Sequence, residues 1–180
     1  MAKVRDKSRI PNILRVIARI NQREARVGIF EDAPRLVQVA AANEFGVDQP
    51  VTPELHKLLR LLAREYGAPT DTLPKVGGRF RIPERSFLRA TADESEDTLR
   101  EAATESITRM MRGELDAYET LVETAKPIQQ AVIERVARGD GFEPNDPFTV
   151  ALKGHARPLI GRTGVLETTQ GIRLRVVRRA

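Results

Sequence analysis

The sequence predicts an α+β protein in which long helices pack on one face of a small, mostly antiparallel β-sheet. Apolar residues recur at helical spacing over much of the chain, and three short segments have the composition or alternation of strands. Glycine and proline separate these segments. No internal repeat or break in composition divides the chain, so we expect a single domain over residues 1–180.

The N-terminal part is expected to form a helix, a strand and a second helix. In residues 10–20, Pro11 lies near the helix start, and the helical spacing of the apolar residues predicts one buried stripe. That stripe consists of Ile10, Ile13, Leu14, Ile17 and Ile20. Residues 26–30 are rich in β-branched and aromatic side chains, as strands are, and the helix over 35–46 is predicted to stop at Gly46.

A helical insertion that leaves the core is expected around residues 51–67, because Thr52 and Pro53 favour a helix start and Gly67 a stop. The next predicted element is a half-exposed strand over residues 79–82, in which apolar residues alternate with arginines. Pro83 ends this strand because it has no N–H to donate.

Two long helices are predicted near residues 91–112 and 114–137. Thr91 and Glu94 have the spacing of a capping box at the start of the first helix. Its apolar stripe consists of Leu99, Ala103, Ile107, Met110 and Met111. Because Pro127 has no N–H and collides with the preceding turn, the second helix is predicted to kink or restart there.

The last third of the chain is expected to be a surface loop followed by short elements. These are a helix over 149–154, a glycine turn at 161–164, a second helical turn over 164–169 and a strand over 172–177.

Composition excludes several kinds of site. The absence of Cys excludes disulfides, thiolate zinc sites and cysteine nucleophiles, and two histidines cannot form a histidine-rich metal site. Aromatic residues make up only 4% of the chain, which leaves little for a base-stacking surface. The segment Met1–Lys7 is charged, unlike a signal peptide, and no stretch of about 18 apolar residues occurs. We therefore expect a soluble protein that is made in a cytoplasm and has no membrane contact.

The net charge of +5 is unevenly distributed. Residues 91–143 carry −7, whereas residues 1–50, 51–90 and 144–180 carry +3, +4 and +5. The acidic block is either a solvated helix face or a surface that meets the basic surface of the next copy in a head-to-tail ring.

The sequence contains no motif that indicates catalysis. The turn Gly161–Gly164 lacks the Gly-Lys-Ser/Thr ending of a nucleotide-binding loop, so a structural turn is the better interpretation. His56 and His155 have no carboxylate or nucleophile close in sequence, and both are expected at the surface. The acidic cluster at 93–97 falls in the first turns of a helix, where the helix dipole stabilises negative charge. We expect no enzymatic activity, no metal and no cofactor.

Arginines at alternate strand positions are the candidates for contact with nucleic acid or with a ring lumen. They are Arg79, Arg81, Arg173, Arg175, Arg178 and Arg179, with Arg85 and Arg89 nearby. Such strands can line a channel and contact phosphates without reading sequence. The alternative is that these arginines cover the solvent face of the sheet or pair with the acidic helices.

Four stretches follow one another along the chain: Ala41–Gly46, Ile82–Arg89, Pro144-Asn145 with Thr149 and Lys153-Gly154, and Pro158–Leu166. In order and spacing they resemble the tail-completion and neck proteins of tailed bacteriophages, a family described as minor tail protein Z-like or virion morphogenesis proteins. The family usually has Asp where Gly161-Arg162 stand, so this turn is altered here. The segment 47–78 is longer than in the simplest members.

The resemblance implies a structural virion protein at the head–tail junction that forms a homo-oligomeric, often hexameric, ring. Its implied partners are the portal adaptor or other neck proteins and the tail tube or terminator proteins, with packaged double-stranded DNA as a further candidate. The motif residues with implied structural roles are Glu44, Phe45, Gly46, Pro83, Arg85, Phe87, Leu88, Pro158, Leu159, Thr163 and Gly164. Among them, Phe45, Phe87 and Leu88 are expected as core anchors. The alternative function is that of a small basic protein that binds DNA without sequence specificity.

Overall fold

The computed structural model describes residues 10–161 and 163–179. The segment Met1–Lys7 and Arg162 of the expected glycine turn lie outside the described residues. In chain order the elements are α1 (Ile10–Asn21), β1 (Arg23–Gly28), α2 (Pro34–Phe45), β2 (Val47–Pro50), α3 (Pro53–Tyr66), η1 (Thr70–Thr72), β3 (Arg79–Ile82), α4 (Leu88–Glu94), α5 (Glu96–Met111), α6 (Ala117–Arg138), α7 (Pro147–Lys153), η2 (Val165–Glu167) and β4 (Arg173–Arg178).

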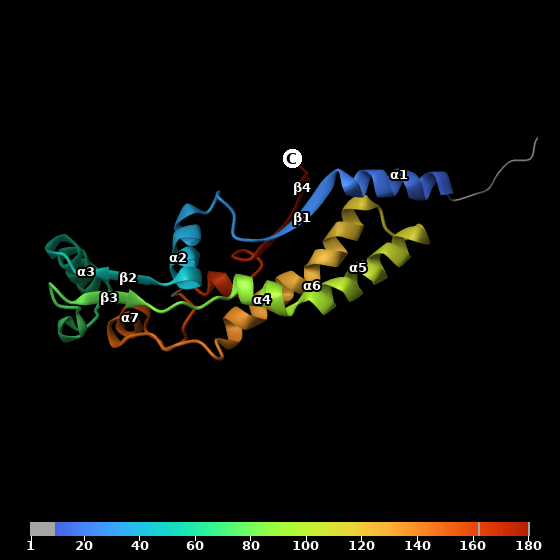
Figure 1. Ribbon diagram of the computed structural model, residues 1–180. Helices are drawn as coiled ribbons and strands as arrows, with labels where there is room; N and C mark the ends of the chain where they lie inside the picture. The colour runs from blue at the N-terminus through green and yellow to red at the C-terminus, as the bar shows by residue number, and fades with distance from the viewer. Residues whose placement is uncertain (1–9, 162, 180) are drawn as a thin grey trace, which may run out of the picture.

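The prediction of an α+β protein with antiparallel strands is confirmed. The strands form two separate pairs, β1 with β4 and β2 with β3, where the sequence suggested one sheet. Figure 1 shows β1 and β4 above α6, whereas β2 and β3 lie at the other end of the molecule with α3 and α7. Helix α2 stands between the two pairs, so each pair is supported by a different set of helices.

Helix α6 is the central support of the fold. It packs along α5 and also contacts α1, α4 and the β1–β4 pair. A capping box starts it, since the Asp116 side chain accepts the N–H groups of Tyr118 and Glu119 while the Glu119 side chain accepts that of Asp116. The helix then continues through Pro127 to Arg138, so the alternative of a restart at this proline is wrong.

The capping box expected at Thr91 and Glu94 is not formed. Thr91 lies inside α4, where its hydroxyl donates a 2.6 Å hydrogen bond to the carbonyl of Phe87. The helix begins earlier, at Leu88, and Ser95 separates α4 from α5 within the predicted single helix. The start signal was misread because a more distant side chain caps this helix, as described below.

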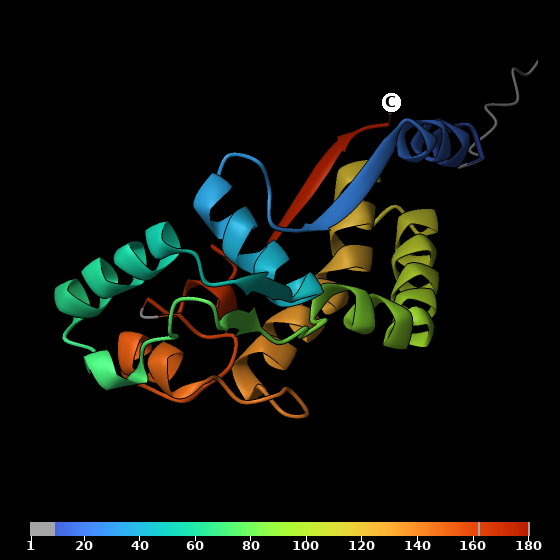
Figure 2. The same ribbon diagram turned by 60° about the vertical axis from the view of Figure 1, so that its left-hand side comes forward.

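Two hydrophobic clusters form the interior. The larger lies between α6, α2 and the β1–β4 pair, and its buried members are Ala40, Phe87, Val132, Ile133, Val136, Leu159, Ile160, Leu166 and Ile172. The smaller belongs to α3, α7 and the adjoining loops, and its buried members are Leu59, Ala63, Ala68, Leu73 and Phe148. We call α3, η1, β2, β3 and α7 the distal lobe (Figure 2). The helical insertion around 51–67 thus has its own core, filled by Phe148 of α7.

Helix α1 differs from the expectation of a buried stripe. None of its residues is buried, and Ile10 and Leu14 are 63% and 60% exposed. Only one side of the apolar face rests on α6, while α1 extends from β1 along the end of the α5–α6 pair (Figure 1). The spacing of the apolar residues correctly indicated a helix but not what covers it.

Candidate functional site

Two of the arginines expected to contact phosphates are paired with carboxylates of the same chain. The Nε atom of Arg79 lies 2.6 Å from the Asp48 carboxylate on the neighbouring strand. Arg81 reaches Glu143 at 3.2 Å. The pKa of Asp48 is lowered, chiefly because Arg79 donates a hydrogen bond to it. These contacts cross-link β2, β3 and the loop before α7.

On β4, Arg173 and Arg175 converge on a single carboxylate, that of Asp32, at 2.5 and 2.6 Å. Hydrogen bonds from Arg173 hold the pKa of Asp32 well below its usual range. The Phe30 ring lies beneath the two guanidinium groups, 5.4 and 4.2 Å from its centroid, in cation–π geometry. Both arginines therefore tie the β1–α2 loop to β4.

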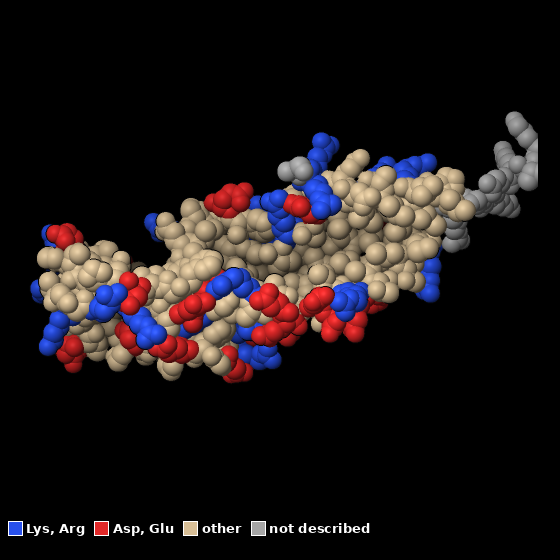
Figure 3. All heavy atoms as spheres, viewed as in Figure 1, with Lys and Arg blue, Asp and Glu red and all other residues tan. Residues whose placement is uncertain are grey.

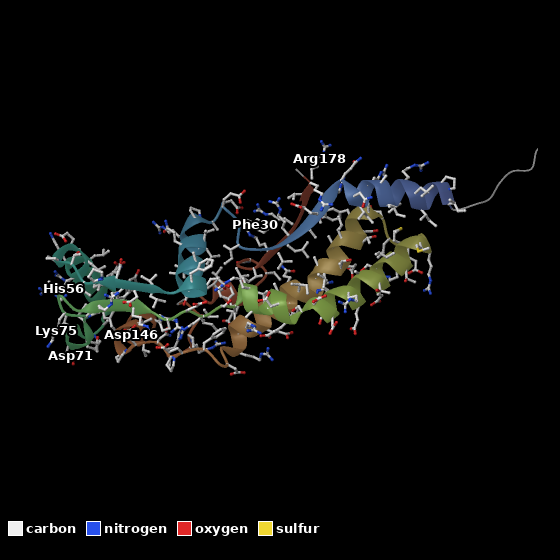
Figure 4. The ribbon with its side chains drawn as sticks, in the orientation of Figure 1. Phe30, His56, Asp71, Lys75, Asp146 and Arg178 are labelled. Carbon is white, nitrogen blue, oxygen red and sulfur yellow. The ribbon has the colours of Figure 1, made fainter. Side chains whose placement is uncertain are left out.

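Arg178 lies at the end of β4 (Figure 4), and Arg179 follows it. Both are exposed and form no ion pair with any described residue. Arg178 lies directly opposite Arg23 of β1 in the strand register. The arginines predicted as one set thus fall into two groups: four are neutralised within the chain, and two remain at the tip of the β1–β4 pair.

Described residues of the four family-like stretches meet in one place, which we call the motif junction: residues 43–46, 82–89, 143–145, 158–161 and 163–166. Its centre is the Glu44 carboxylate, which is 3% exposed. This carboxylate accepts the backbone N–H groups of Phe87, Leu88 and Arg89 at 2.9 to 3.0 Å. The start of α4 is therefore capped by a side chain from the end of α2, across more than 40 residues of sequence.

The electrostatics of this cap favour the ionised carboxylate. Burial tends to raise the pKa of Glu44, but hydrogen bonds from the backbone of Leu88 and Arg89 and from the Ser86 hydroxyl outweigh it, so the pKa is lowered. The guanidinium of Arg89 adds an ion pair at 3.1 Å. The buried charge is thus well compensated.

Arg85 is a second buried polar residue of the motif junction and is 2% exposed. Its guanidinium donates to the Asn43 side chain at 3.0 Å and to the carbonyls of Glu143 and Pro144 at 2.9 and 3.1 Å. Nearby, burial and the charge of Arg85 lower the pKa of Lys153 to about 8. Arg85 therefore fastens the loop before α7 to the end of α2.

The remaining motif residues act as spacers and core residues, with one correction. Phe87 is fully buried, Leu88 is partly buried, and Leu159 is 3% exposed. Phe45, expected in the core, is instead 64% exposed, and the Arg89 guanidinium lies 5.0 Å from its ring centroid. Glu44 takes the inward position at the end of α2, and the next residue, Phe45, therefore points outward.

The motif residues not yet described are two prolines and the turn formed by Thr163 and Gly164, and they have local roles. Pro83 is buried directly after β3. Pro158 follows the loop after α7 and accepts a hydrogen bond from Lys153. Thr163 lies in a turn, and Gly164 takes the left-handed conformation before η2.

The histidines and acidic residues form no site among residues 10–161 and 163–179. His56 Nδ1 lies 2.9 Å from the carbonyl of Pro74, and His155 Nε2 lies 3.4 Å from that of Gly161. Within those ranges no group of three or more His, Asp or Glu side chains is placed to hold a metal ion. No helix of the described part of the chain has the length and apolar content to cross a bilayer.

An apolar groove, which the sequence interpretation missed, runs between α1 and α5 over α6. It encloses about 440 Å³ and is lined mainly by Ile13, Ile17, Ile20, Ile107, Met110, Met111 and Leu121. Ile107 and Met111 are 45% and 53% exposed, because α6 covers the adjacent face of α5, where Ser106 and Met110 are buried. The predicted stripe on α5 exists, but only part of it is covered.

Charge is distributed over opposite edges of the molecule. Figure 3 shows Asp and Glu along the edge of α4 and α5 with some Lys and Arg among them, and Lys and Arg around β4 and α1 on the opposite edge, where an acidic patch also lies. Some acidic residues pair locally, as Glu96 and Asp97 do with Arg100.

Comparisons of the chain with family models, with curated proteins and with solved structures give no match.

Proposed function

We propose that this protein is a structural subunit that assembles with its own copies into a ring at the head–tail junction of a tailed bacteriophage, and that it catalyses no reaction. The observation that carries the proposal is the apolar groove between α1 and α5 with its exposed rim. Ile17 of α1 and Ile107 and Met111 of α5 line it and are 40%, 45% and 53% exposed. Burying such a surface contributes about 25 cal/mol per Å², which makes it suited to protein contact.

The charge distribution supports contact between copies of the same chain. Exposed glutamates of α5, such as Glu101 and Glu105, and exposed arginines of α1, such as Arg15 and Arg19, offer opposite charges on different parts of one molecule. Surfaces that complement each other on different faces favour a head-to-tail arrangement, which closes into a ring when the rotation between copies permits. Charge contributes orientation and encounter rate there.

The motif junction supports the assignment to a phage neck or tail-completion protein. The stretches that resemble this family lie far apart in sequence, yet Glu44 and Arg85 join three of them through direct hydrogen bonds. Leu159 of the fourth stretch packs with Phe87 in the larger hydrophobic cluster. The four stretches therefore belong to one packed unit and are not four independent motifs. The proposed partners are a portal adaptor or other neck proteins on one side and tail tube or terminator proteins on the other.

Analytical ultracentrifugation of the full chain tests the assembly. The wild type is expected to sediment as a species larger than the monomer, and Met111→Asp, which places a charge in the groove, is expected to sediment as a monomer. The matched control is Leu58→Asp on α3, because Leu58 is 52% exposed but lies in the distal lobe. A wild type that stays monomeric at every concentration, and is missing from purified virions, would overturn the proposal.

Charge reversal tests whether opposite edges meet. Glu101 and Glu105 lie exposed on α5, and Arg15 and Arg19 lie exposed on α1. Reversing either pair alone is expected to weaken association, and reversing both is expected to restore part of it. Equal weakening in the single and combined variants would exclude this contact.

A further inference from the structure

Helix α3 of the distal lobe carries a stripe of positive charge that none of the sequence motifs indicated. Lys57, Arg60 and Arg64 follow one another at intervals of three and four residues, so they share one side of the helix. All three are exposed. With a rise of about 1.5 Å per residue, they span roughly 10 Å along the helix axis.

These three cations differ from the four paired strand arginines because none forms an ion pair with a described residue. The carboxylates of α3 itself, Glu54 and Glu65, lie at its two ends. By contrast, Arg79, Arg81, Arg173 and Arg175 are each held by a carboxylate of their own chain. Release of condensed counterions by phosphate contact needs cations that are free to exchange partners.

The stripe forms one wall of a surface groove of about 480 Å³. Its other lining residues are Pro53, His56, Leu61 and Thr70. Lys75 lies at the same end of the molecule as His56, in the loop before β3 (Figure 4). No Phe or Tyr lines this groove, so it offers no platform for stacked bases of a single strand.

We propose that this α3 stripe, consisting of Lys57, Arg60 and Arg64, binds the phosphate backbone of duplex DNA without reading its sequence. Duplex DNA presents closely spaced negative charges along a rigid axis, which a row of cations on a helix can follow. This binding is independent of the proposed ring.

Fluorescence anisotropy with a short labelled duplex of mixed sequence tests the proposal. The full chain is compared with a variant that combines Lys57→Gln, Arg60→Gln and Arg64→Gln, over salt concentrations from about 50 to 200 mM. The matched control combines Arg23→Gln, Arg178→Gln and Arg179→Gln. It removes the same charge from exposed arginines at the tip of the β1–β4 pair.

Wild type and control are expected to bind with a steep dependence on salt. In the α3 variant, the slope of log K against log salt is expected to be shallower by about 3, because each lost phosphate contact contributes about 0.9. Equal slopes in wild type and α3 variant would overturn the proposal. A slope that becomes shallower only in the control variant would overturn it as well. Circular dichroism of the variant confirms that α3 remains folded.

Sedimentation of the same variants separates this inference from the ring. An α3 variant that loses association but keeps its DNA slope would show that the stripe meets the acidic edge of another copy, which contradicts the DNA proposal. A monomeric wild type that still shows the α3-dependent slope would leave DNA binding in place and remove the ring.

Discussion

The motif junction and the α1–α5 groove reverse the usual relation between polarity and burial. In the junction, two charged residues, Glu44 and Arg85, are 3% and 2% exposed. In the groove, the apolar residues Ile17 and Met111 are 40% and 53% exposed. The difference shows that burial in this chain follows the availability of partners. Glu44 and Arg85 have all their hydrogen-bonding partners within the chain, whereas the outer side of α1 has no covering element among the described residues.

The two regions should therefore respond to mutation in opposite ways. Changes in the motif junction should reduce the free energy of unfolding and leave contacts between copies intact. Changes in the groove should alter those contacts with little effect on the folding of the single chain.

Glu44→Ala is expected to have the largest effect, a loss of about 3 kcal/mol in the free energy of unfolding. The substitution removes the acceptor of three backbone N–H groups at the start of α4 and leaves them without a partner. The control is Glu84→Ala, because Glu84 pairs with the same Arg89 but is exposed, and a loss below about 1 kcal/mol is expected. If urea denaturation gives equal losses of unfolding free energy for the two variants, the buried cap contributes no more than the exposed ion pair.

Gly46→Ala is expected to reduce stability by about 2 kcal/mol. Gly46 has φ of 71°, and a Cβ there would lie 3.0 Å from the N atom of Glu84 and 3.1 Å from the carbonyl oxygen of Ile82. Gly67 also has a positive φ, 70°, but its ψ of 21° lies in the left-handed helical region, whereas that of Gly46 is 167°, and nothing lies within 4 Å of its Cβ position. It therefore lacks both the unusual ψ and the close approach. Gly67→Ala should therefore lose only about 1 kcal/mol by thermal or urea unfolding. If the two alanine variants are equally stable, close approach at Gly46 is not the constraint.

The Glu44 cap also predicts a dependence on pH. The pKa of Glu44 is lowered in the folded chain from its ordinary value of 4.5, so its stabilising effect is complete above that value and is lost as the pH falls through the folded pKa. Relative to Glu44→Gln, the wild type should lose stability over this acidic range, by no more than about 1.4 kcal/mol per pH unit. Parallel curves of unfolding free energy against pH for the two proteins would contradict the lowered pKa.

The sequence predicts where the helices and strands lie more readily than it predicts which residues contact them. Local signals located α2, α3 and β3 because Gly46, Gly67 and Pro83 act on their own backbone. The start of α4 could not be found locally, because its cap is a carboxylate from α2. Phe45 was placed in the core on its apolar character alone, although Glu44 occupies the inward position.

The candidate sites show the same division. Alternating arginines were recognised on β3 and β4, but their pairing with Asp48, Glu143 and Asp32 depends on loops that periodicity does not place. The stripe on α3 follows helical spacing and could have been read from residues 57–64. What no pattern contains is that these cations form no ion pair with a described residue in the folded chain.

Met111→Ser should have the smallest effect on the single chain and the clearest effect on assembly. Met111 is 53% exposed at the groove, so the free energy of unfolding of the monomer should change by less than about 0.5 kcal/mol. If copies of the chain cover the groove, the melting temperature of the wild type rises with protein concentration, since association stabilises only the folded state. That rise should disappear in Met111→Ser and persist in Leu61→Ser, a comparably exposed change on α3. Scanning calorimetry over a range of concentrations measures it. A rise that persists in Met111→Ser would place the contact between copies away from the groove, and no rise in the wild type would mean that the apolar surface stays uncovered by other copies.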